Sequence, residues 1–132
     1  MEYSSLVLME KDKETGFIKR EVGSFEVNEG AEYVQKFFMV ENIVSLYFDT
    51  KRDVEEWEFS AIFDLFDKKP FIDEGFSIED ETEEYNPTFV VKFEYEPDYL
   101  KMKEKVDKCI DIIKAQMEKV FIDIEGKKND YK

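Results

Sequence analysis

The sequence predicts an α+β domain in which an antiparallel sheet of about five strands packs against one long C-terminal helix. Two observations support this fold class. Residues 97–125 carry apolar side chains every three or four positions, which places them on one face of a helix. The segments before it alternate apolar and polar residues, as strands with one buried face do. A sheet and a helix of this kind bury their apolar faces by packing together, and 132 residues suit a single domain, residues 1–132.

The helix expected over residues 97–125 is the longest element, at roughly 40 Å for a rise of about 1.5 Å per residue. Asp98 is suited to cap its N-terminus, and Gly126 is suited to end it. Its apolar stripe consists of Met102, Val106, Cys109, Ile110, Ile113, Met117, Val120, Phe121 and Ile124. A stripe of this length requires a partner surface, and the preceding strands supply one.

Two strands are expected first, over residues 3–9 and 17–27. The polar connector between them contains Gly16, as a hairpin favours, and Gly23 indicates a bulge in the second strand. The spacing of Val34, Phe37 and Phe38 then predicts a short helix near residues 29–40, capped by Asn28. Tyr, Val and Phe also favour strands, so the sequence leaves a strand open for this segment.

The clearest hairpin predicted from the sequence joins residues 43–50 to residues 57–65. Both segments alternate apolar and polar side chains, and a polar turn at residues 51–53 separates them. Residues 89–95 repeat the alternation and lead directly into the long helix. Residues 67–87 have neither pattern, so we expect a long irregular loop there.

The composition is that of a folded, strongly acidic protein. Hydrophobic residues make up 42% of the chain, which is enough for a packed core, and the net charge is −14. This charge repels phosphate backbones and anionic membranes, so we expect no direct binding to nucleic acid or membranes. Lys greatly outnumbers Arg, and Glu, Ile and Phe are frequent, a bias typical of AT-rich bacterial genomes.

The expected location is the cytoplasm. The one cysteine, Cys109, cannot form an internal disulfide or a thiolate metal site, and its place on the apolar stripe predicts burial. The apolar run at residues 6–9 is too short for a signal peptide or a membrane span. These features together predict a soluble cytoplasmic protein.

Catalytic chemistry has little support in the sequence. The chain contains no His, which excludes imidazole bases and metal ligands, and it lacks the Gly-rich loops that bind phosphates. Residues 10–21 space their acidic side chains like an EF-hand loop, but Thr15 stands where that loop needs Gly, and strands flank it. We therefore predict no catalytic, cofactor-binding or metal-binding residues, and no cofactor.

The segment expected to bind a partner lies within residues 67–87, where aromatic side chains interrupt a dense acidic run. Long loops in compact domains often carry function, and the charge would suit a basic protein surface. The predicted partner-binding residues are Asp73, Glu74, Phe76, Glu81, Glu83, Glu84 and Tyr85. The alternative is that these residues are solvated surface, with Phe and Ile side chains covering the edge of the core.

Three functions follow, in order of preference. The first is a non-catalytic protein-interaction module, such as an inhibitor, an immunity-type protein or a regulator, that engages a basic partner. The second is a ligand-binding domain with an aromatic-lined pocket between sheet and helix; an aromatic content of 16% supports it. The third is a hydrolase that uses carboxylates and a metal ion.

Overall fold

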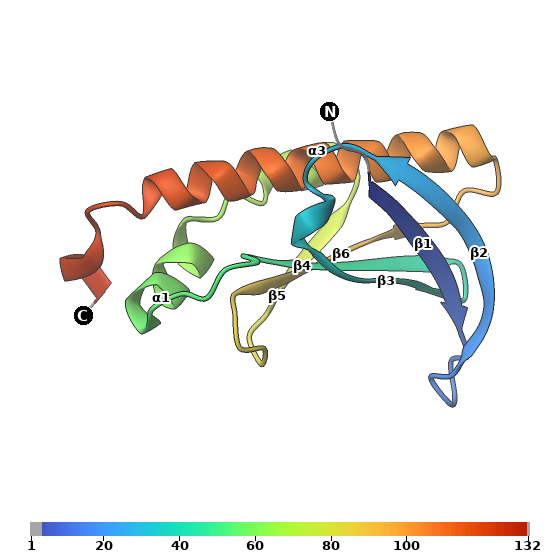
Figure 1. The fold of residues 1–132 in the computed structure, drawn as a ribbon, viewed down its shortest axis with the longest axis horizontal. Helices are drawn as coiled ribbons and strands as arrows, with labels where there is room; N and C mark the ends of the chain where they lie inside the picture. Colours follow the sequence, from blue (N-terminus) through green and yellow to red (C-terminus); the bar gives the residue numbers. More distant parts are fainter. Residues whose placement is uncertain (1–3, 132) are drawn as a thin grey trace.

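The computed structural model, which describes residues 4–131, places one long helix, α3 (Tyr99–Asp123), across one face of a six-stranded sheet (Figure 1). The strands, in their order across the sheet, are β2 (Ile18–Val27), β1 (Ser4–Lys11), β3 (Val34–Val40), β4 (Ile43–Asp49), β6 (Thr88–Glu94) and β5 (Ser77–Glu81). The α+β class and the C-terminal helix are therefore confirmed.

The sheet is mixed, which corrects the expectation of about five antiparallel strands. All neighbouring strands are antiparallel except β1 and β3, which run parallel and pair through Met9 with Phe38 and Glu10 with Met39. The cause is the path of the chain after β2. It does not form a second hairpin on β2 but returns to the other side of β1, and a strand that opposes β2 there must run parallel to β1.

The long helix matches its prediction closely. Asp98 caps it, because its Oδ1 accepts a hydrogen bond from the Lys101 backbone N–H at 3.2 Å. Gly126 follows the last turn with φ = 75°, a left-handed conformation that suits glycine. The fully buried stripe of α3 consists of Met102, Val106, Cys109, Ile110, Ile113, Met117 and Val120.

The sheet's inner face completes the core against this stripe. Its buried side chains include Leu8, Phe25, Met39, Val44, Leu46, Phe48, Phe89 and Val91. At one end of α3 the Tyr99 hydroxyl donates a hydrogen bond to the Ser24 carbonyl at 2.8 Å, and the Tyr99 ring stacks on Phe25 with centroids 5.2 Å apart. The helix therefore extends from β2 across the sheet to the segment between β4 and β5.

The strand expected over residues 57–65 is wrong, because these residues form helix α1 (Glu56–Leu65). Alternation by two positions includes spacings of four, and a helix satisfies those as well. Phe59 and Phe63, four residues apart, meet edge to face with centroids 5.0 Å apart. The Glu55 backbone N–H donates to Glu58 Oε1 at 2.9 Å, half of a capping box that the sequence analysis overlooked.

The irregular loop expected over residues 67–87 is also wrong in most of its length. It contains the short helix α2 (Lys69–Asp73) and the edge strand β5, which leaves only residues 82–87 as a turn before β6. Gly75 has φ = 87° and turns the chain between α2 and β5. Strand β5 was not predicted because only one of its residues, Ile78, is apolar, and its pairing with β6 defines it.

The short helix expected near residues 29–40 is confirmed only in part. Near residues 29–40 the only helix is one 3-10 turn, η1 (Ala31–Tyr33), with Gly30 rather than Asn28 at its cap, and β3 takes up the remaining residues. The β1–β2 hairpin and its bulge are confirmed. The register passes from Leu8 opposite Gly23 to Met9 opposite Glu21. Tyr3, which was expected to begin β1, lies outside the described residues.

The first prediction tests the contact between helix and sheet. Replacing Ile113 with Asp places an unpaired charge in the core, because Ile113 is fully buried. We expect the free energy of unfolding to fall by about 4 kcal/mol or more. The matched control is Ala115→Asp, which puts the same charge on an exposed position two residues away. Urea denaturation followed by circular dichroism measures both, and equal stabilities for the two variants would contradict the packing.

A second prediction concerns Gly30, which brings η1 against α3. Its φ is 116°, and a Cβ at this position would lie 2.9 Å from the Ile110 carbonyl oxygen. Gly30→Ala should therefore cost about 2 kcal/mol or more in unfolding free energy.

Gly16→Ala is the control for backbone strain alone, since Gly16 also has a positive φ but has no neighbouring atom within 4 Å of the added Cβ. We expect it to cost about 1 kcal/mol. Chemical denaturation of both variants separates the two effects. A smaller loss for Gly30→Ala than for Gly16→Ala would show that the close approach to α3 is unimportant.

Candidate functional site

The structure divides the predicted partner-binding residues into two groups at opposite ends of β5. Asp73, Glu74 and Phe76 precede the strand, whereas Glu81, Glu83, Glu84 and Tyr85 lie at or beyond its end. A strand of five residues is roughly 17 Å long at about 3.3 Å per residue, so the two groups do not form one site.

The first group is largely engaged within the protein. Asp73 pairs with Lys69 at 2.8 Å, and Glu74 pairs with Lys108 of α3 at 3.4 Å. The Phe76 side chain is only 6% exposed, and its ring meets Phe93 edge to face with centroids 5.3 Å apart. Phe76 therefore belongs to the core and does not present its ring to a partner.

The second group surrounds the turn at residues 82–87. Glu81 accepts a hydrogen bond from the Glu83 backbone N–H at 3.0 Å, which orders the start of the turn. Asn86 Nδ2 donates to Asp53 Oδ1 at 3.3 Å and so ties the turn to the segment that follows β4. The Tyr85 side chain is 80% exposed. This end of the sheet thus presents an aromatic side chain on a turn that hydrogen bonds hold in place.

Carboxylates gather around this turn, and we call Asp49, Asp53, Glu81, Glu83, Glu84 and Tyr85 the acidic end of the sheet. Within residues 4–131, none of its five carboxylates forms an ion pair. A small hollow of about 160 Å³ lies between Asp49 and Glu84 and is also lined by Gln35, Lys36, Tyr47 and Thr88. The arrangement concentrates five carboxylates, and Lys36 is the one basic side chain that residues 4–131 contribute to the lining of the hollow beside them.

Asp49 shows the effect of burial at this acidic end. Partial burial, together with the nearby charge of Glu84, raises the pKa of the Asp49 carboxyl above its usual 3.8. Two hydrogen bonds act in the opposite direction: Asp49 Oδ1 accepts from the Lys51 backbone N–H at 2.8 Å and from Gln35 Nε2 at 3.1 Å. Burial, with a smaller contribution from Glu84, outweighs these bonds, so ionisation of Asp49 costs more in the folded protein than in the unfolded chain.

A larger groove of about 690 Å³ lies at the other end of β6, between α3 and the start of β5. It is in the region where the sequence placed an aromatic-lined pocket, but its lining combines Phe76 and Phe93 with Lys and Glu side chains. These groove residues were not predicted from the sequence. The available signal was the spacing of Lys101, Lys105 and Lys108, which places three ammonium groups on one flank of the helix.

The part of the chain that the structure describes holds no group of three or more Cys, Asp or Glu side chains that could bind a metal ion. In the hairpin that resembles an EF-hand loop in spacing, Asp12 accepts from the Thr15 backbone N–H at 2.8 Å and thereby orders the turn. Cys109 is fully buried, and burial raises the pKa of its thiol.

These features define an acidic α+β domain with a mixed six-stranded sheet, one long helix, an acidic end and a groove that contains lysines. None of the helices within residues 4–131 has the length and hydropathy needed to cross a membrane. The chain belongs to the family described as "Family of unknown function (DUF6762)", whose model matches residues 1–132. No curated protein and no solved structure matches the chain.

A third prediction follows from the environment of Asp49. Asp49→Asn keeps an Oδ1 that accepts both hydrogen bonds and removes the unfavourable charge, so it should stabilise the protein at neutral pH. Because the folded-state pKa is raised, the cost of ionisation is fully present at neutral pH and disappears as the pH falls below about 3.8. The stabilisation should disappear over the same range.

Urea denaturation at neutral pH and near pH 3 measures this dependence. Glu83→Gln is the control, because it removes one charge from an exposed position in the adjacent turn. A gain for Asp49→Asn that is independent of pH, or that Glu83→Gln matches at every pH, would contradict the proposed effect of burial.

Proposed function

We propose that the protein is a non-catalytic interaction module that binds a basic protein surface through the acidic end of its sheet. The observation that carries this proposal is the set of five carboxylates without ion-pair partners around Tyr85. Eleven of the other acidic side chains within residues 4–131 form ion pairs with Lys or Arg. Among the five carboxylates around Tyr85, the exposed ones of Glu83 and Glu84 also accept no side-chain hydrogen bond within residues 4–131, so they are free to form ion pairs with Lys or Arg of another protein.

Tyr85 supplies an aromatic contact surface in addition to the charged groups. Aromatic residues are enriched among those that contribute most to binding energy, because they bury a large area and lose little conformational freedom. Tyr85 stands 80% exposed on a turn that Glu81 and Asn86 restrain through hydrogen bonds. In this proposal the carboxylates accelerate association with the partner, and the Tyr85 ring slows dissociation of the complex.

The proposed class is that of an inhibitor, an immunity-type protein or a regulator in the cytoplasm. Proteins of this class act by occupying a surface and need no catalytic group. The absence of His from the chain and the engagement of its single Cys in the core favour such a role over nucleophilic chemistry. A net charge of −14 favours a basic protein as partner and disfavours nucleic acid and anionic membranes.

The fourth prediction separates the two contributions. The basic partner is first captured from a bacterial lysate with the immobilised protein, and its binding is then measured by stopped-flow and surface plasmon resonance. Glu83→Gln with Glu84→Gln should lower the association rate constant and weaken its dependence on salt. Tyr85→Ala should instead raise the dissociation rate constant by about 30-fold, which corresponds to about 2 kcal/mol.

The matched control is Glu14→Gln with Glu125→Gln, which changes the net charge equally, from −14 to −12, at exposed positions away from the acidic end. Point variants are required because a deletion of residues 77–84 would remove β5 from the sheet. If the control pair slows association as much as Glu83→Gln with Glu84→Gln, and Tyr85→Ala leaves dissociation unchanged, the acidic end is not the binding surface.

A further inference from the structure

We infer that the groove between α3 and the sheet binds a small anion that carries an apolar body. The groove has a volume of about 690 Å³, within the range of roughly 300–1,000 Å³ that small-molecule sites occupy. Its walls are the first half of α3 and the connection from α2 to β5, and the last residues of β6 form its floor. This site lies at the opposite end of β5 from Tyr85, so it is independent of the proposed partner surface.

The groove is lined by four lysines and four glutamates, so a bound anion has to contact lysines that no glutamate already engages. Lys101, Lys105 and Lys108 are spaced by four and three residues and therefore lie along one flank of α3. Like charges at such spacings repel each other by a few tenths of a kcal/mol, roughly, when nothing compensates them. Lys92 also lines the groove, from β6. Glu104, three residues after Lys101 and four before Lys108, offsets part of the repulsion, and a bound anion would offset more of it.

The ammonium groups differ in how far they are already engaged. Lys108 pairs with Glu74 at 3.4 Å. Within residues 4–131, neither Lys92 nor Lys101 forms an ion pair, and Lys105 forms none with a side chain. Lys105 Nζ instead donates to the Glu94 carbonyl oxygen at 3.0 Å, which holds it over the floor of the groove, 6.0 Å from the centre of the Phe93 ring.

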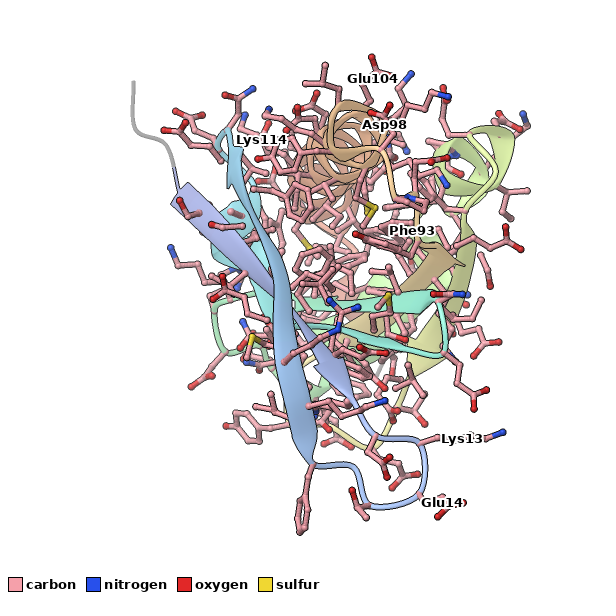
Figure 2. The ribbon with its side chains drawn as sticks, turned by 90° about the vertical axis from the view of Figure 1, so that its right-hand side faces the viewer. Lys13, Glu14, Phe93, Asp98, Glu104 and Lys114 are labelled. Carbon is pink, nitrogen blue, oxygen red and sulfur yellow. The ribbon has the colours of Figure 1, made fainter. Side chains whose placement is uncertain are left out.

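Of the four glutamates that line the groove, only Glu74 forms an ion pair with one of its lysines, Lys108, within residues 4–131. Glu96 Oε1 accepts a hydrogen bond from the Asp98 backbone N–H at 3.3 Å, just before the helix. Glu104 lies at the rim, on the side of α3 away from the sheet, whereas Phe93 lies between helix and sheet (Figure 2). The ammonium groups of Lys101 and Lys105, which form no ion pair within residues 4–131, are therefore available to an anionic ligand.

The apolar part of the ligand has its own contact surface. Ile43 is 42% exposed and lines the groove from the start of β4. The edges of Phe76 and Phe93 continue this surface, with the two rings packed edge to face. A carboxylate, phosphate or sulfonate group would contact the lysines while an aliphatic or aromatic body covers Ile43. The groove thus fits an amphiphilic small molecule rather than an inorganic ion alone.

The fifth prediction uses 8-anilinonaphthalene-1-sulfonate as the probe, with uncharged N-phenyl-1-naphthylamine for comparison. Fluorescence titration of the folded protein should show saturable binding of the sulfonate and binding about tenfold weaker, or less, of the neutral compound. Amide chemical shifts in ¹H–¹⁵N spectra should change at Gly75, Ser77 and Lys105, which line the groove. Lys101→Gln with Lys105→Gln should weaken sulfonate binding about tenfold, equivalent to about 1.4 kcal/mol, while the protein stays folded.

The control is Lys127→Gln with Lys128→Gln, which changes the net charge by the same amount, from −14 to −16, after the end of α3. It should leave the affinity for the sulfonate unchanged. Competition with octanoate and with octyl phosphate then shows which acid group the lysines prefer, and displacement by either supports the inference. Equal binding of the neutral compound, equal loss in both double variants, or displacement by neither competitor would overturn it.

Discussion

The fold depends on one interface, the burial of the apolar stripe of α3 against the inner face of the sheet. The stripe contributes seven buried side chains, and the sheet opposes them with aliphatic and aromatic residues such as Leu46 and Phe89. Removing each large apolar side chain from water contributes about 1.5–3 kcal/mol before conformational entropy is counted. The groove exists because this helix lies over the last residues of β6 and extends past the start of β5. The same interface therefore sets the position of the lysines.

The sequence predicted this interface well and the other elements unevenly, for a physical reason. Over 25 residues, a helical stripe cannot be mistaken for alternation, because the two periods diverge within a few turns. Over the ten residues of α1 they do not diverge enough, and the pairs Trp57 with Ala61 and Phe59 with Phe63 satisfy both. The parallel pairing of β1 with β3 and the edge strand β5 arise from contacts distant in sequence, so no local pattern signals them.

The candidate sites show the same limit. Composition identified residues 67–87 as an acidic segment with aromatic side chains, but it could not separate Phe76, which lies in the core, from Tyr85, which faces solvent. That difference results from the pairing of β5 with β6. The turn that carries Tyr85 faces Asp49 and Asp53, which come from a segment more than 30 positions earlier. Likewise, the lysine spacing on α3 was readable in the sequence, whereas the opposite wall of the groove was not.

The position of Cys109 makes the helix–sheet interface directly measurable. The chain's one thiol faces the core from the middle of α3, and burial raises its pKa, so very little thiolate is present at neutral pH. A disulfide reagent can therefore react with it only in molecules whose helix has separated from the sheet. When reclosing is fast, the labelling rate reports the fraction of open molecules without any denaturant. The native protein thus carries an intrinsic chemical reporter of its own opening equilibrium.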